Sequence, residues 1–76
     1  MDVATRRRAN SAWAKASEAQ ATAEEASAVA LTASAEAQHV EGRNDIARQY
    51  LRLAEHSRMQ SAIYSEAAAQ FRQMAR

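Results

Sequence analysis

The sequence predicts an all-α protein, a long antiparallel two-helix hairpin that forms an alanine-rich coiled coil and assembles into a helical bundle. Three observations lead to this fold class. The 76 residues include no Pro and one Gly, a composition typical of nearly continuous helix. Between residues 9 and 36, Ala occupies the first, fourth and sixth places of four consecutive seven-residue units. A single break in this pattern, around Gly42, divides the chain into two arms.

The first helix is predicted at about residues 4–40. A spacing of three and four residues keeps one side of a helix turned toward a partner, and methyl-sized side chains let the partner backbone come unusually close. We therefore expect the first- and fourth-place Ala rows to face the second helix. The sixth-place row consists of Ala14, Ala21, Ala28 and Ala35. We expect it on the opposite side, where either Ala fills exposed positions because of its helix propensity or a third helix packs.

The turn is predicted at residues 41–44 and the second helix at about residues 45–75. Gly42 suits the left-handed conformation that follows a helix C-terminus, and Asn44 or Asp45 is a natural N-cap. So short a connection makes the two helices antiparallel neighbours. Residues 1–76 are thus expected to form a single helical hairpin.

The second helix carries large side chains at the spacing that the seam between the helices requires. The predicted seam residues are Tyr50, Leu53, Tyr64 and Phe71. Folding the chain about Gly42 pairs residues whose numbers add up to about 86, so Ala37 meets Tyr50 and Ala16 meets Phe71. Large side chains of one helix then pack against small ones of the other, as close packing requires.

Six large apolar side chains lie off this predicted seam: Trp13, Val29, Leu31, Leu51, Met59 and Ile63. Single apolar residues on a surface are normal. The alternative is a second contact face, because a two-helix layer buries only one side of each helix and the first helix offers mainly methyl groups. We favour this alternative and expect a homo-oligomer, with a dimer preferred, or a complex with a different protein.

The sequence lacks the residue patterns from which catalytic and metal sites are usually built. It contains no Cys, which excludes disulfides and thiol chemistry, and no Gly-rich phosphate loop. Glu36-x-x-His39 has the spacing of carboxylate-bridged di-metal bundles, but Ala33 and Ala37 are expected in the core, which puts both ligands on the flank. His56 is expected on the surface. We therefore expect no metal, no cofactor and no enzymatic activity, since a two-helix rod offers no concave pocket.

The only run of like charges is Arg6-Arg7-Arg8. It is either a solvated first turn or a phosphate contact, and three cations at a helix N-terminus oppose the helix dipole. The second helix is a further candidate for holding a phosphate or a nucleotide, although pairing with the Glu-rich first helix explains most of its cations. Those cations are Arg48, Arg52 and Arg58.

The net charge of +1 favours neither nucleic acid nor membrane as a partner, and no apolar run suits a membrane span or a secretory signal. We expect a cytoplasmic, non-catalytic helical module that presents a helical surface to another protein or to itself. The alternative is a small nucleic-acid-associated regulator that uses Arg6, Arg7 and Arg8. Adaptor, chaperone-like protein and regulatory subunit all stay open.

Overall fold

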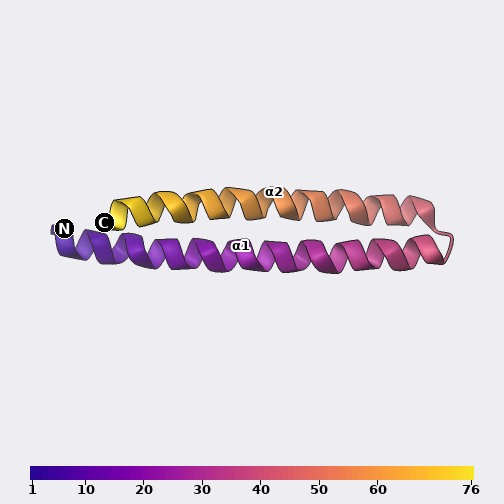
Figure 1. Ribbon diagram of the computed structural model, residues 1–76, viewed down its shortest axis with the longest axis horizontal. Coiled ribbons are helices and arrows are strands. Elements are labelled where there is room, and N and C mark those ends of the chain that lie inside the picture. The colour runs from indigo at the N-terminus through magenta and orange to yellow at the C-terminus, as the bar shows by residue number, and fades with distance from the viewer.

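The computed structural model describes residues 1–76 as two antiparallel α-helices joined by a short turn, which confirms the predicted all-α hairpin. Helix α1 spans Val3–Val40 and helix α2 spans Asn44–Ala75. They lie side by side along most of their length, with both termini at one end and the turn at the other (Figure 1). The backbone extends 60 Å along its longest axis and 15 and 12 Å across it. The molecule is therefore a rod, two helices wide and one helix thick.

Helix α1 begins with a capping interaction at Asp2, which we did not expect from the sequence. The Asp2 carboxylate accepts a 2.7 Å hydrogen bond from the backbone amide of Thr5, and so satisfies one of the amides that lack a partner inside the helix. The same hydrogen bond lowers the pKa of Asp2 below its ordinary value, because it stabilises the ionised carboxylate. This negative charge also offsets part of the cost of three cations near the positive end of the helix dipole.

The turn ends α1 with the two hydrogen bonds of a Schellman motif. The amide of Gly42 donates to the carbonyl of His39 (2.9 Å), and the amide of Arg43 donates to the carbonyl of Gln38 (2.8 Å). Gly42 adopts a φ of +80°, the left-handed conformation expected of it. A residue with a Cβ atom would pay about 1–2 kcal/mol for this conformation.

Helix α2 begins without a side-chain cap. Arg43 occupies the N-cap position and makes no capping hydrogen bond. The prediction that Asn44 or Asp45 caps α2 is wrong, because both residues already lie inside the helix. The side chain of Asn44 is engaged elsewhere, with its Oδ1 atom 2.7 Å from Nδ1 of His39.

The seam between the two helices is lined by Ala and Ser. The buried residues are Ala14, Ser17, Ala21, Ala28 and Ala35 on α1 and Ala47, Ala54, Ser57 and Ala68 on α2. The prediction that the sixth-place row of α1 lies opposite the seam is therefore wrong, since its four alanines are at most 8% exposed. The first- and fourth-place rows, which we expected in the seam, are exposed from Ala12 to Ala37. Ala33 and Ala37 accordingly lie on the surface and not in the core.

Ser61 shows how close the two helix backbones come. Its hydroxyl donates a 3.0 Å hydrogen bond to the backbone carbonyl of Ala21 on the other helix, although Oγ lies only one bond beyond Cβ. Steps of seven residues from this pair place Ala28 level with Ala54, and both of these residues are 0% exposed. Facing residues in this row thus have numbers that add up to 82 instead of about 86, a shift of roughly one helical turn.

Large side chains stay out of the centre of the seam, and no large side chain is fully buried. Leu53, predicted in the seam, is 53% exposed. That prediction is wrong because the seam follows Ala54, and consecutive helical residues point about 100° apart. Three other predicted seam residues, Tyr50, Tyr64 and Phe71, are partly buried beside the small row. Leu31, which we expected on the outside, is partly buried in the corresponding position of α1.

Candidate interaction surfaces

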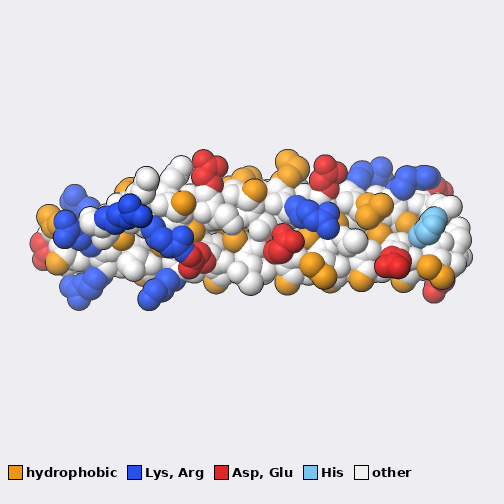
Figure 2. Space-filling model, in the orientation of Figure 1, with side chains coloured by type: hydrophobic (Ala, Val, Ile, Leu, Met, Phe, Trp, Pro, Cys, Tyr) orange, Lys and Arg blue, Asp and Glu red, His pale blue; other side chains and the backbone are white.

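Along one flank of the seam, the two helices interact through polar side chains. Arg72 pairs with Glu18, and Arg58 donates a 3.1 Å hydrogen bond to the hydroxyl of Thr32. The two pairs are spaced by two heptads on each helix, so they lie on the same side of the hairpin. We call this side the charged face. Figure 2 shows acidic and basic side chains distributed along both helices.

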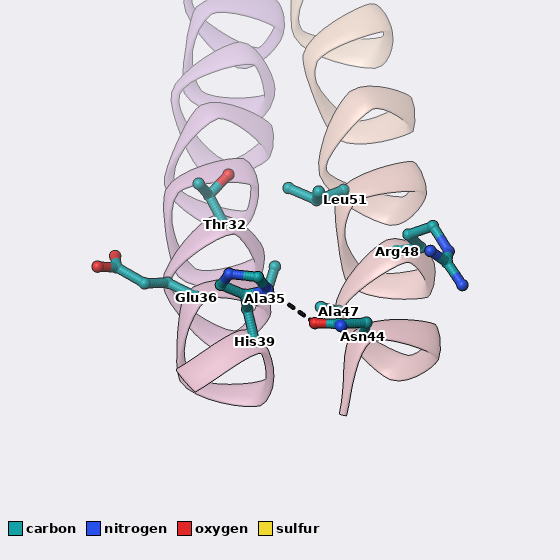
Figure 3. Close-up of a pocket in the computed structure, with 8 residues that line it drawn as sticks. All are labelled: Thr32, Ala35, Glu36, His39, Asn44, Ala47, Arg48 and Leu51. Atoms are coloured by element: carbon teal, nitrogen blue, oxygen red, sulfur yellow. Dashed lines mark hydrogen bonds between the residues drawn. The ribbon is translucent and has the colours of Figure 1, made fainter. Parts of the chain in front are cut away.

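Near the turn, the charged face contains an open groove of about 500 Å³. It is lined by Thr32, Ala35, Glu36, His39, Asn44, Ala47, Arg48 and Leu51 (Figure 3). The hydrogen bond between His39 and Asn44 joins the two helices there. The Glu36 carboxylate is directed away from the ring of His39, so the Glu36-x-x-His39 pair does not converge on one point. No group of three or more Asp, Glu or His side chains is placed to hold a metal ion.

The arginines of α2 that we considered for phosphate binding are largely engaged. Arg48 pairs with Asp45, and Arg58 is bound to Thr32. Arg52 is exposed. Neither partner is a Glu of α1, so the prediction that pairing with the Glu-rich first helix explains most of these cations is wrong. Arg72 does make such a pair, with Glu18.

The side chains predicted for a second contact face do not lie together. Leu31 is partly buried beside the seam, and the other five are between 48% and 61% exposed. Heptad spacing places Val29 and Leu51 on the charged face and Met59 on the outer edge of α2. Trp13 and Ile63 lie on the face opposite the charged one.

On that opposite face, the α1 row next to the seam includes the partly buried Glu24. The rest of the face carries no Asp, Glu, Lys or Arg between Ala9 and Met74, and we call it the uncharged face. It consists of two heptad rows on each helix: Ala9, Trp13, Ala16, Gln20, Ala23, Ser27, Ala30, Ser34 and Ala37 on α1, and Ile46, Gln49, Leu53, His56, Gln60, Ile63, Ala67, Gln70 and Met74 on α2. Five of the large hydrophobic side chains that the hairpin exposes lie on it, namely Trp13, Ile46, Leu53, Ile63 and Met74. The ring of Trp13 stacks on Phe71 with centroids 6.2 Å apart. Sequence reasoning missed this face, and the signal that could have revealed it is the absence of charge from four heptad rows between Ala9 and Met74; toward the N-terminus, Arg6 continues the row of Trp13.

Basic side chains gather at the open end of the hairpin. Arg6, Arg7 and Arg8 are exposed in the first turns of α1. Because the helices are antiparallel, Arg72 and Arg76 of α2 reach the same end, and Figure 2 shows the concentration of basic side chains there. The Arg run is therefore part of a larger basic region.

These surfaces define a class of molecule, a helical hairpin with two broad helical faces and an open groove near the turn. In comparisons with protein-family models, with curated proteins and with solved structures, the chain matches none. Neither helix combines the length and the apolar character needed to cross a membrane. Its activity must therefore be inferred from its own surfaces.

Proposed function

We propose that the chain is a non-catalytic helical protein-interaction module, of the adaptor, chaperone-like or regulatory-subunit kind, that acts as an oligomer through a helical surface. One observation carries the proposal. Every buried residue is Ala or Ser, whereas eleven large hydrophobic side chains are 39% or more exposed. Burial of such a side chain stabilises a fold or a complex by about 1.5–3 kcal/mol. In this hairpin most of that free energy is left for a partner. We also propose a cytoplasmic location, which the lack of Cys fits.

The solution mass tests this proposal. Light scattering over a dilution series, with helicity followed by circular dichroism, should show one of two results. A helical oligomer that melts at a lower temperature on dilution supports self-association. A poorly helical monomer supports a module that folds on a foreign partner. A fully helical monomer whose melting temperature does not depend on concentration would overturn the proposal.

A second candidate function is that of a small nucleic-acid-associated regulator, and the basic end of the hairpin favours it. Binding through Arg6, Arg7 and Arg8 should produce an affinity for duplex DNA that falls steeply with salt. Replacing these three residues by Ala should abolish the affinity. The matched control replaces Arg48, Arg52 and Arg58 by Ala, which removes the same charge away from the basic end and should leave DNA binding intact. Equal effects of both triple variants, or no affinity at low salt, would exclude this function.

A further inference from the structure

We propose that the uncharged face binds a second copy of this chain, so that two hairpins stack face to face as a four-helix bundle with both turns at the same end. This inference rests on the proposed function and specifies both the partner and the surface. Three features of the face carry it: its charge, its area and the level at which its large and small residues lie.

The charge of the face suits a symmetric pair. In a two-fold symmetric interface the same patch is used on both copies. Any ionised group in the patch would have to be desolvated and paired, and unpaired burial of a charge is costly. The uncharged face has no carboxylate, ammonium or guanidinium group among its eighteen positions, and the α1 row beside it adds one carboxylate per copy, that of the partly buried Glu24. The charged face carries acids and bases along both helices and already uses Glu18, Arg58 and Arg72 within the hairpin.

The area of the face matches what a specific dimer needs. The rod measures 60 Å by 15 Å in the plane of its two helices. Covering one such side removes about 900 Å² of surface from each copy, or about 1,800 Å² in total, which lies within the range of standard specific interfaces. A shallow hollow of about 240 Å³, lined by Ile46, Gln49, Tyr50 and Leu53, adds relief that a partner helix can fill.

The residues of the face are placed so that large side chains meet small ones. On α1 the outer row of the uncharged face is all Ala. On α2 the inner of its two rows includes Ile46, Leu53 and Met74, one row farther from the seam than Tyr50, Tyr64 and Phe71. The pairing set by Ser61 and Ala21 brings Ile46 nearly level with Ala37, Leu53 with Ala30 and Met74 with Ala9.

A two-fold axis parallel to the long axis of the rod places α1 of one copy on top of α2 of the other. Because rotation about this axis does not move a residue along the rod, residues that are level within one hairpin stay level between the two copies. Ile46, Leu53 and Met74 then each lie level with an Ala methyl group of the partner's α1, as close packing requires. An axis across the rod would instead stack α2 on α2 and α1 on α1. That arrangement opposes large side chains to large ones and leaves a gap between the Ala rows, so we infer that both turns lie at the same end.

A pair of matched double variants tests the surface. Leu53→Glu with Ile63→Glu places two acids on the uncharged face, and Leu51→Glu with Met59→Glu places two acids off it. The four residues are exposed to similar extents, between 48% and 60%, so both variants add the same charge at sites of similar exposure. We expect the first variant to raise the dimer dissociation constant by about 100-fold or more, as for loss of central interface residues, and the control to leave it within about threefold. Equal weakening by both, or weakening by the control alone, would overturn the proposal.

Disulfide trapping tests the parallel arrangement of the two hairpins. It stays informative even if the Glu variants above fail to fold once they no longer dimerise. The chain has no Cys of its own. The double variant Ala30→Cys, Leu53→Cys should form a covalent dimer on mild oxidation. In the proposed arrangement, the thiol at position 30 of one copy lies near the thiol at position 53 of the other. The control Val29→Cys, Leu51→Cys introduces two thiols at a similar level on the charged face and should stay uncrosslinked. Trapping by the control alone, or by neither, would overturn the proposal.

The wild-type chain separates failure of this inference from failure of the proposed function. A dimer whose single Trp shifts its fluorescence to shorter wavelength on association supports the inference, because Trp13 is 59% exposed in the hairpin and lies on the uncharged face. A poorly helical monomer overturns the inference and leaves the proposed function standing. A stable helical monomer overturns both.

Discussion

Replacing Ala28 by Phe tests the position of the seam. Ala28 is 0% exposed and lies level with Ala54, which is also 0% exposed, so an added phenyl ring fits only if the helices separate. Overpacking of a closed core position costs about 1–3 kcal/mol. We expect the upper end, about 3 kcal/mol, because the ring must push apart two backbones in close contact. For a domain of this size, that loss lowers the melting temperature by about 12–24 °C.

The matched control is Ala26→Phe. Ala26 belongs to the fourth-place row that the sequence alone puts in the seam, and the structure leaves it exposed. Only the difference in helix propensity, at most about 0.7 kcal/mol, should be lost there. Thermal unfolding by circular dichroism at one fixed protein concentration compares the two. Equal melting temperatures, or a larger loss for Ala26→Phe, would refute the reasoning about the seam.

Three further predictions concern the ends of the helices. Gly42→Ala should lower the free energy of unfolding by about 1 kcal/mol, because the left-handed backbone is strained for Ala. The lower entropy of the unfolded chain offsets only part of this strain, and an unchanged midpoint of urea unfolding would contradict the prediction. Arg43→Ser should raise the free energy of unfolding by about 0.5–1 kcal/mol by supplying the missing cap of α2, which the same titration measures. The lowered pKa of Asp2 means that its capping contribution is present above the unfolded-state pKa and is lost as the pH falls through the folded-state pKa. The NMR chemical shift of the Thr5 amide should therefore titrate on acidification, at a pH below the ordinary Asp pKa, because its hydrogen bond to Asp2 is lost. This titration should be absent in Asp2→Ala, and the same acid response in both proteins would count against the cap.

Local signals in the sequence were sufficient to predict the two helices and the turn. The helix bounds predicted from composition agree with the structure to within one residue, because the only interruption of helix propensity lies at Gly42. The caps were harder to predict. Asn44 has the chemistry of an N-cap but lies inside α2, and Asp2 caps α1 although it precedes the alanine repeat.

The seam could not be predicted from α1 alone, because its three Ala rows are chemically the same. The side of α1 that carries two Ala rows is the more apolar choice, yet the structure turns it outward and buries the single sixth-place Ala row together with Ser17 of a neighbouring row. Contacts with α2 account for this orientation. They include the stacking of Trp13 on Phe71 and the pairing of Glu18 with Arg72, both between residues far apart in the chain.

The sequence by itself determined that this chain forms two helices joined at Gly42, because helix propensity and a left-handed glycine act over a few residues. Only the tertiary structure decided which side of each helix faces the other. That choice is a long-range one, set where Ser61 reaches the backbone of Ala21. The same choice leaves Leu53 and Ile63 exposed on a face without charge, since the helix backbones lie too close together to admit large side chains between them.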